Sequence, residues 1–387
     1  MRPVIRLRPK ADARRLRRGH PWAWSDEIVA DRRTRGLAPG TLVRLEDAER
    51  RPIGLAATGG GERIAARILD TDPEAEIGAA WIEARLRSAL SHRERLYDAP
   101  YYRLVHAEAD GLPGVVIDRF GKTAVLQPNA AWAASLEREF AAALGALGME
   151  HVIRSGSGRA RAAEGLDDRT EILRGAPPER VEVPMNGAIY IADLMGGQKT
   201  GLFYDQRPNH AFAARLAASG RVLDVFSHVG GFALAALAGG AREAQCVDGS
   251  QAALELASEG ARLMGRELAT TRADAFDALQ AMDGERFELV ICDPPAFAPS
   301  KGARDAGLRA YERIARLAAP IATEYLVLCS CSHAADLEAF RAACIRGIGR
   351  AGRRAQIVHT GFAGPDHPVH PALPESGYLK ALVFRMT

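Results

Sequence analysis

The chain has 387 residues, and its 51 Lys and Arg residues nearly balance its 48 Asp and Glu residues, which leaves a net charge of +3. This length allows two or three domains, and local clusters of charge are therefore more informative than the total. The chain has five cysteines and no C-x2-C pair, which excludes a disulfide framework and a zinc site. Reduced thiols in the cytoplasm are therefore expected. No apolar run has the length of a membrane span.

Residues 1–72 are predicted to form a small β-rich domain, because short alternating runs are divided by Gly, Pro and Asp. Cations in this domain precede Trp22 and Trp24, and they are Arg14, Arg15, Arg17 and Arg18. Basic residues beside aromatic rings can grip phosphates and stack on bases, which indicates an RNA-binding surface. The alternative is a solvated basic face with both tryptophan rings in the core. Core packing is the preferred interpretation of the tryptophans, and both interpretations stay open for the arginines.

Residues 73–182 are predicted to form a small central α+β domain. A helical pattern extends from about Glu74 to Leu96, and strand-like runs then alternate with a helix over residues 130–148. No catalytic constellation is evident here, so this domain is expected to shape the substrate site or to serve packing. The polar, Gly- and Arg-rich stretch from Ser155 to Glu171 is predicted to be a mobile loop.

Residues 183–387 are predicted to form a doubly wound, Rossmann-like α/β domain. A hairpin and a helix start near Asp205 are followed by alternating strands and helices. Seven strands are expected, over residues 222–226, 243–248, 269–275, 288–293, 325–330, 354–360 and 378–384. The last two form an apolar hairpin, which is a plausible contact for a homodimer.

The turn after the first strand of this domain predicts a cofactor site. Gly230 and Gly231 allow close approach of the backbone to a ligand, but the pattern lacks G-x-G-x-x-G, which disfavours NAD. Asp248, at the end of the next strand, can accept hydrogen bonds from ribose hydroxyls, so S-adenosylmethionine is the expected ligand. The candidate cofactor residues lie at successive strand ends and are Asp224, Phe226, Ser227, Gly230, Asp248, Ser250, Asp274 and Ala275. The alternative for each aspartate is that it caps the next helix.

The fourth and fifth strands end in residues that indicate a reaction on a nucleobase. DPPAF contains Asp293, Pro294 and Phe297, which can bond the amino group of a planar base and stack on it. A thiolate in the following motif, LCSCSH, can add to C6 of a pyrimidine and make C5 nucleophilic enough to take a methyl group from a sulfonium. Cys331 is better placed for this role than Cys329, which lies on the strand itself. The alternative is that both are small buried hydrophobic residues.

The stretch QKTGLFYDQR precedes the sheet and carries three further candidates. Lys199 and Arg207 either cover the cofactor or grip phosphate, together with Asp205. The alternative is an ordinary helix start with Asp205 as its cap.

Eight motifs carry a resemblance to a known family that spans nearly the whole chain. In order, they are HPWAWSDEI, ADGLPGVVIDRFG, QKTGLFYDQR, VLDVFSHVGGFALAALAGGA, VDGS, DPPAF, CSCSH and DHPVHPALPESGYLK. This set resembles the bacterial large-subunit ribosomal RNA cytosine-C5 methyltransferase I family. The resemblance implies an N-terminal PUA domain, a central α+β domain and a class I methyltransferase domain. It also implies S-adenosylmethionine as methyl donor and 5-methylcytosine in 23S rRNA as product.

The resemblance also implies roles for single residues. The turn from Asp224 to Gly231 would contact the methionine part of the donor, Asp248 the ribose and Asp274 the adenine amino group. Asp293 would orient the cytosine and Cys331 would be the nucleophile. The family commonly has Tyr-Thr where this chain has His228-Val229, and the group that removes the C5 proton stays unassigned.

Cytosine-C5 methylation of ribosomal RNA through a Cys331 adduct is therefore the functional hypothesis. One alternative is a base methyltransferase with another product, such as 7-methylguanine. Another is a non-catalytic RNA-binding assembly factor, and a nicotinamide dehydrogenase ranks last because the phosphate-binding glycines are missing.

Overall fold

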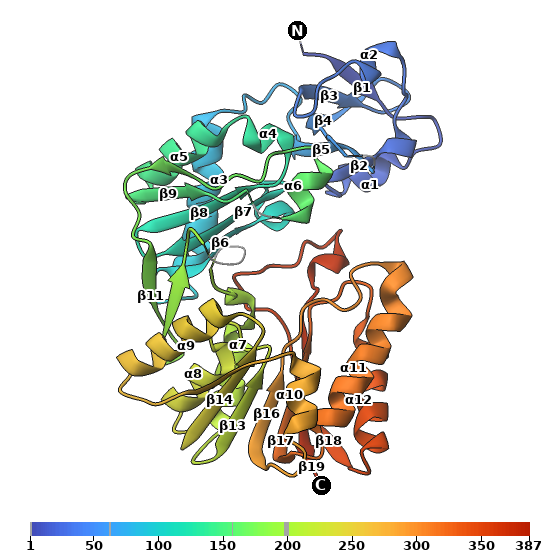
Figure 1. Cartoon of the computed structure of the whole chain (residues 1–387). Coiled ribbons are helices and arrows are strands. Elements are labelled where there is room, and N and C mark those ends of the chain that lie inside the picture. The colour runs from blue at the N-terminus through green and yellow to red at the C-terminus, as the bar shows by residue number, and fades with distance from the viewer. Residues whose placement is uncertain (1, 62, 157, 197–200) are drawn as a thin grey trace. The chain divides into compact units, whose positions relative to one another are not determined.

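A computed structural model describes residues 2–61, 63–156, 158–196 and 201–387, and its chain divides into two compact units. The first unit comprises Met1–Glu179, Leu194–Thr200 and Asp366–Ser376. The second comprises Arg180–Asp193, Gly201–Pro365 and Gly377–Thr387. The segment Asp366–Ser376 thus belongs to the first unit, although its flanking residues belong to the second (Figure 1).

The first unit begins with a five-stranded sheet in the order β1-β3-β4-β5-β2. Its elements are β1 (Val4–Arg6), α1 (Ala13–Arg17), β2 (Trp22–Trp24), α2 (Arg32–Arg35), β3 (Leu42–Glu46), β4 (Pro52–Thr58) and β5 (Ile64–Asp70). The alternating runs of this region, VIRLR, TLVRLE, PIGLAAT and RIAARIL, form β1, β3, β4 and β5. Alternate side chains of these strands face a core of aliphatic residues, as a half-buried sheet requires.

The strand β2 contradicts the expectation that both tryptophan rings lie in the core. Ala23 is fully buried in that core, and Trp22 and Trp24 project from the opposite face of the strand, half-buried. Their rings meet edge to face with centroids 5.4 Å apart. The indole of Trp22 donates a hydrogen bond of 2.9 Å to Glu108, which ties the first sheet to the next one.

The second sheet of this unit has the order β10-β9-β8-β7-β6. Its elements are α3 (Ala79–Glu94), β6 (Tyr101–His106), β7 (Val115–Phe120), β8 (Thr123–Pro128), α4 (Ala131–Ala134), α5 (Glu137–Ala146), β9 (His151–Arg154), α6 (Arg159–Ala163) and β10 (Glu171–Arg174). The single helix expected over residues 130–148 is two helices. The break falls at Ser135, whose hydroxyl donates to the carbonyl of Trp132.

The described part of residues 155–171 is not the loose loop that its composition predicts. It contains α6, and Arg161 on that helix is buried. The Arg161 guanidinium donates to the carbonyls of Pro128 and Asp167, at 2.5 and 2.9 Å. Glu164 is also buried and pairs with Arg67 at 2.8 Å. Charged residues that usually mark a solvated loop therefore anchor this one.

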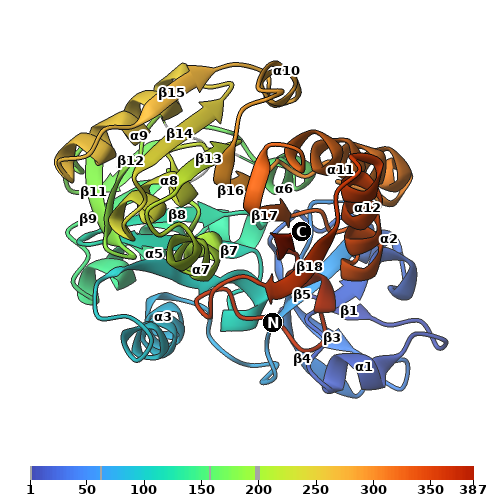
Figure 2. The same ribbon diagram turned by 90° about the horizontal axis from the view of Figure 1, so that it is seen from below.

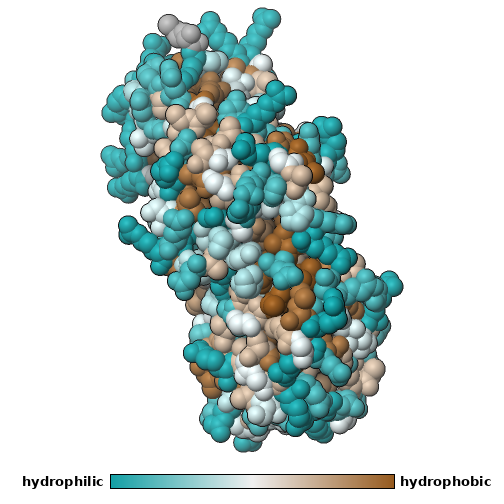
Figure 3. All heavy atoms as spheres, turned by 90° about the vertical axis from the view of Figure 1, so that its left-hand side faces the viewer, coloured by the Kyte–Doolittle hydropathy of each residue, from teal (hydrophilic) through white to brown (hydrophobic). Residues whose placement is uncertain are grey.

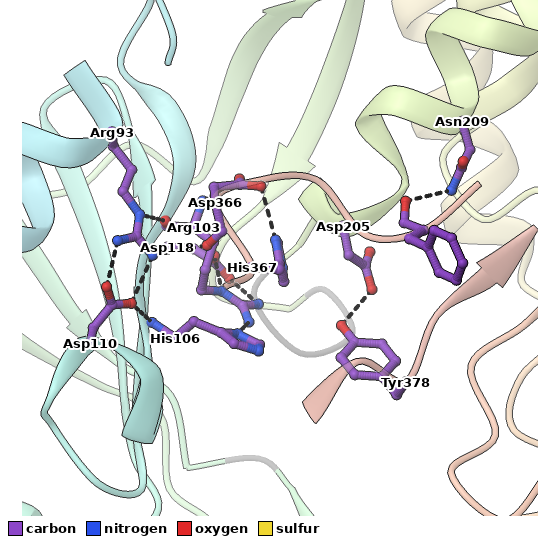
Figure 4. Close-up of polar contacts among 11 residues, drawn as sticks. Arg93, Arg103, His106, Asp110, Asp118, Asp205, Asn209, Asp366, His367 and Tyr378 are labelled. Carbon is purple, nitrogen blue, oxygen red and sulfur yellow. Dashed lines mark hydrogen bonds and ion pairs between the residues drawn. The ribbon is translucent and has the colours of Figure 1, made fainter. Parts of the chain in front are cut away.

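A buried network fixes the segment Asp366–Ser376 to the rest of the first unit (Figure 4). Arg93, on α3, has no exposed surface, and its two terminal nitrogens bond Asp110 at 2.5 and 2.7 Å. One of them also donates to the Asp366 carbonyl at 2.9 Å. The Asp366 carboxylate accepts from the Arg103 amide at 3.0 Å and pairs with His367 at 3.0 Å.

Arg93→Met is expected to lower the free energy of unfolding by about 3–5 kcal/mol, because it leaves the buried carboxylate of Asp110 without its partner. Urea denaturation measures this change. Arg87→Met on the same helix is the matched control, since the Arg87–Glu83 pair is exposed and should contribute less than about 1 kcal/mol. Equal effects of the two substitutions would contradict a structural role for the buried pair.

The second unit is built on a seven-stranded sheet in the order β15-β14-β13-β16-β17-β19-β18. Its strands are β13 (Arg221–Val225), β14 (Glu243–Asp248), β15 (Ala269–Arg272), β16 (Phe287–Cys292), β17 (Ala322–Ser330), β18 (Ala355–Gly361) and β19 (Lys380–Met386). All seven expected strands are confirmed. The first five in sheet order are parallel, and β19 is antiparallel to both of its neighbours. The order reverses at β13, which predicts a ligand site at the carboxyl ends of β13, β14 and β16.

Helices cover both faces of this sheet. They are α7 (Arg207–Leu216), α8 (Gly231–Ala238), α9 (Gln251–Leu263), α10 (Ala275–Ala281), α11 (Arg304–Ala318) and α12 (Leu337–Arg350). The views in Figures 1 and 2 agree that α8 and α9 lie on one face and α11 and α12 on the other. A hairpin of β11 (Arg180–Met185) and β12 (Ala188–Asp193) packs against α8 and α9. This is the doubly wound domain that the alternation of strands and helices predicts.

No helix in the described ranges is a candidate for a membrane span. None of the helices there combines the length and the apolar character needed to cross a bilayer. On the face drawn in Figure 3, hydrophilic side chains are spread widely, with smaller hydrophobic areas among them.

Candidate active site

The carboxyl end of β13 holds a buried acid beside a strained turn. Asp224 is 1 % exposed, and its Oδ2 accepts from the amides of Phe232 and Ala233 at 3.2 and 3.0 Å, in the first turn of α8. Its Oδ1 has no hydrogen-bond partner among the described residues. Burial raises the pKa of Asp224 to about 7. An acceptor that is buried and lacks a partner fits a ligand that brings its own donor.

The turn itself has an unusual backbone. Phe226 and His228 have φ angles of 62° and 49°, in the left-handed region that non-glycine residues rarely adopt. Gly230, at φ 79°, is the N-cap of α8, and a Cβ there would meet Ala257 and Leu234 at 3.1 and 3.2 Å. Ser227, which lies between Phe226 and His228, is buried. Strain of this kind is concentrated at functional sites, where the surrounding structure holds it.

Asp248 connects this turn to the next helix. Its Oδ2 accepts from the His228 amide at 2.8 Å, and its Oδ1 accepts from the Ser250 amide at 2.8 Å. Ser250, not Asp248, caps α9, since its hydroxyl accepts from the Ala253 amide at 3.3 Å. The half-exposed Asp248 carboxylate is therefore held rigid at the strand end, as a ribose contact requires.

Asp274 follows β15 and has the alternative role of capping the next helix. It is the N-cap of α10, and its Oδ1 accepts from the amides of Phe276 and Asp277 at 2.8 and 3.2 Å. Its side chain is exposed, and the adjoining Ala275 is buried. The cap fixes the orientation of the carboxylate at the rim of the sheet.

Asp293 lies just beyond β16 and is oriented by residues that the sequence did not single out. Its Oδ2 accepts from Gln206 Nε2 at 2.9 Å. Gln206 Oε1 in turn accepts from Asn209 Nδ2 at 2.7 Å, and Asn209 also donates to the Phe362 carbonyl at 3.2 Å. Gln206 and Asn209 are 3 % and 4 % exposed, so the chain of bonds is buried. These hydrogen bonds fix Oδ2 of Asp293, whose side chain is half-exposed.

Asp205 does not cap α7, which contradicts one of the two interpretations of its motif. The helix starts at Arg207 after a short 3-10 turn over Tyr204–Gln206, and its N-cap is Gln206. Asp205 is buried and its Oδ2 accepts from the hydroxyl of Tyr378 at 2.6 Å (Figure 4). The Arg207 guanidinium lies over the Tyr204 ring, 5.4 Å from its centroid. Lys199 lies outside the described residues.

The loop after β17 presents the thiol of Cys331 near the end of β16. Cys331 is half-exposed, whereas Cys246, Cys292, Cys329 and Cys344 are buried. Its Sγ lies 3.9 Å from the carbonyl oxygen of Pro294, the residue after Asp293. The structure therefore brings the two predicted catalytic residues to neighbouring strand ends and leaves Cys329 in the core.

Hydroxyl groups hold that loop in place. The Tyr311 hydroxyl contacts Ser332 Oγ at 2.7 Å and accepts from Ser330 Oγ at 2.9 Å. Ser332 Oγ accepts from the Ala298 amide at 3.0 Å, which joins the loop of Cys331 to the end of DPPAF. Phe297 packs near Tyr311, with ring centroids 5.1 Å apart. Both strand ends are thus parts of one hydrogen-bonded unit.

The basic cluster of the first unit is partly neutralised. Arg15 makes a two-pronged contact with Glu27, at 2.9 and 2.7 Å, and Arg17 bonds Asp47 at 2.9 Å. Arg14 and Arg18 are exposed on and just after α1. The cluster is therefore only partly a cationic surface.

Comparison with known proteins matches both parts of the chain. Residues 103–385 match the family described as S-adenosylmethionine-dependent methyltransferase, and residues 5–71 match the PUA-like domain. The ribosomal RNA large subunit methyltransferase I of Aeromonas salmonicida is 35 % identical over 388 residues, covering 97 % of this chain and 98 % of that protein. The protein of the same name from Klebsiella pneumoniae strain 342 is 33 % identical over 390 residues, covering 97 % of each chain.

Solved structures share the fold. A proposed methyltransferase complexed with SAH has a TM-score of 0.82 at 19 % identity, with complete coverage of both chains. A proposed SAM-dependent methyltransferase from Streptococcus mutans has a TM-score of 0.81, again at 19 % identity and complete coverage.

Proposed function

Because this chain belongs to the S-adenosylmethionine-dependent methyltransferases, and within them to the ribosomal RNA large subunit methyltransferase I family, we propose that it methylates C5 of a cytosine in large-subunit ribosomal RNA. S-adenosylmethionine supplies an electrophilic methyl group when it is bound. The observation that carries the proposal is the half-exposed Cys331 thiol, 3.9 Å from the backbone of the residue after Asp293.

The rim of β13 and β14 supports the binding of the donor. Asp224 Oδ1, which has no hydrogen-bond partner in the described part of the chain, suits a ligand that carries hydrogen-bond donors, and the rigid Asp248 carboxylate suits ribose hydroxyls. The turn over residues 226–231 would contact the methionine part, and the Asp274 carboxylate the adenine amino group. Arg207 would cover the cofactor or hold a phosphate.

The target base would be unstacked and held at the ends of β16 and β17, since an enzyme reaches C5 and C6 only when the base leaves its stack. Asp293 accepts a hydrogen bond from the N4 amino group, and Gln206 keeps the carboxylate oriented for it. Pro294 and Phe297 line the same strand end. Recognition of an amino-bearing edge distinguishes cytosine from uracil at this position.

The thiolate of Cys331 then acts as a nucleophile. A Cys331 Sγ–C6 bond forms, and the electrons of the C5–C6 double bond become available at C5, which takes the methyl group as the methyl–sulfonium bond breaks. Transfer of the C5 proton to a base, from a side chain or from solvent, returns the electron pair of the C5–H bond to the ring. The C5–C6 double bond re-forms, the Sγ–C6 bond breaks, and the thiolate is restored.

Other parts of the chain would supply RNA affinity and assembly. We assign residues 1–72 to RNA binding through Arg14 and Arg18, residues 73–182 to shaping of the site, and residues 183–387 to catalysis. A homodimer would form through the edge strand β18, where Ile357 and Val358 are 38 % and 45 % exposed.

The product of the purified chain tests the reaction. Large-subunit RNA from a strain that lacks the gene, incubated with labelled S-adenosylmethionine, should yield 5-methylcytidine on nucleoside mass analysis. RNA from the parent strain is the control and should accept little label, because its site is already modified. Label in 7-methylguanosine would refute the proposal, as would no methyl transfer to RNA in either sample.

A further inference from the structure

One buried cation lies beneath the loop that carries Cys331, and the reaction scheme above does not use it. Lys380 begins β19 and is only 6 % exposed. It lies directly opposite Ser330, the last residue of β17, in the antiparallel pairing of the two strands. Its Nζ donates to the carbonyls of Ser332 and Ala335, at 2.8 and 2.7 Å.

These contacts leave the charge of Lys380 only partly compensated. Carbonyl oxygens satisfy two of the three protons of an ammonium group, but they carry no net charge, and burial of a cation is costly without a counter-ion. Burial lowers the pKa of Lys380, whereas the negative charges of the Cys331 thiolate and of Asp336 raise it.

Among the described residues, Lys380 is the only buried lysine. Tyr311, on α11, is neutral, because burial raises the pKa of its phenol. Two acids flank the loop: Asp293 precedes Pro294, whose carbonyl oxygen lies 3.9 Å from the thiol, and the negative charge of Asp336 raises the pKa of Lys380. His333 lies two residues beyond the thiol and has its own ring contact with Tyr378.

We propose that Lys380 is a positioning residue for the nucleophile: its two hydrogen bonds hold the Ser332–Ala335 loop, and its charge stabilises the thiolate of Cys331. The role of Cys331 as a nucleophile rests on the proposed function, whereas the effect of Lys380 on its thiolate does not. If Lys380 only held the loop, its hydrogen bonds would suffice and its charge would not affect the reactivity of Cys331. Removal of the charge alone therefore distinguishes the two roles.

The test measures alkylation of Cys331 in the full chain with iodoacetamide across pH 6 to 10, read by mass spectrometry of its peptide. The other cysteines are buried, so the reaction reports one thiol. Lys380→Gln keeps N–H donors and removes the charge. Its pH profile is expected to shift upward by about one unit, so that alkylation at pH 7 falls about tenfold, because the thiolate is the reactive form.

Two variants complete the design. Lys380→Arg should return the pH profile toward that of the wild type, and Lys122→Gln, at an exposed lysine that pairs with Glu150, should not change it. An unshifted profile in a folded Lys380→Gln variant would overturn the proposal.

If Lys380→Gln does not fold, the wild-type profile decides alone: a midpoint at or above the ordinary thiol value of about 8.5 overturns the proposal, and a clearly lower midpoint supports it. Neither RNA nor methyl donor enters this measurement. A wrong product in the methylation assay would therefore refute the proposed function without affecting the result on Lys380.

Discussion

Cys331→Ala should abolish methyl transfer, with a loss on the order of 10⁴-fold or more in the rate constant of the chemical step, because it removes the sulfur that forms the bond to C6. Methyl transfer to RNA from the deletion strain measures the loss. Binding of S-adenosylmethionine, followed by calorimetry, should be nearly unchanged, since Cys331 is not among the proposed donor contacts.

A trapping experiment separates this role from a structural one. RNA that contains 5-fluorocytosine should form a covalent adduct with the wild-type chain, because fluorine at C5 cannot leave as a proton does, and Cys331→Ala should form none. Cys329→Ala is the matched control: its thiol is two residues away and 1 % exposed, so the adduct should persist. An adduct that survives Cys331→Ala would show that the nucleophile lies elsewhere.

Asp293→Asn is expected to lower the rate constant for methyl transfer by about 10²–10³-fold while donor binding is retained. The substitution keeps the shape of the side chain and an oxygen that can accept from Gln206, but it removes the negative charge that favours the N4 amino group. Single-turnover kinetics with saturating donor measures the effect.

Asp305→Asn is a suitable control for that experiment, since Asp305 is an exposed aspartate in the first turn of α11 and should not affect the rate. Gln206→Leu keeps the charge of Asp293 but removes the hydrogen bonds of Gln206 to Asp293 and Asn209, and it should have a smaller effect on the rate than Asp293→Asn. A wild-type rate for Asp293→Asn would exclude a charged contact to the base.

The seven strands of the second unit follow from local pattern. Short apolar runs such as that of β13 fix where strands form, and polar residues mark where they end. Because parallel strands present their carboxyl ends at one edge, the sequence alone groups Asp224, Asp248 and Asp293 at one site. Position along β17 also separated Cys331 from the buried Cys329.

Side-chain partners far apart in the sequence could not be predicted in this way. Gln206 and Asp293 are 87 residues apart, and Lys380 and Ser332 are 48 residues apart. Both Gln206 and Lys380 stand in motifs that the sequence displays, QKTGLFYDQR and SGYLK, but a motif does not tell which strand end a side chain will reach.

Orientation within short elements was equally out of reach. In β2 the small Ala23 takes the core position and the two tryptophans face away, although their size favours burial. Arg15 and Arg17 look like a free basic surface until the fold brings Glu27 and Asp47 to them.

The sequence by itself thus determined the elements, their order and the edge of the sheet where polar residues collect, because periodicity and strand ends are local properties of a chain. Only the tertiary structure decided which acids cap helices, which amide orients Asp293 and which cation lies beneath Cys331. Those contacts depend on how distant segments pack, and packing is the sum of many interactions that no local pattern records.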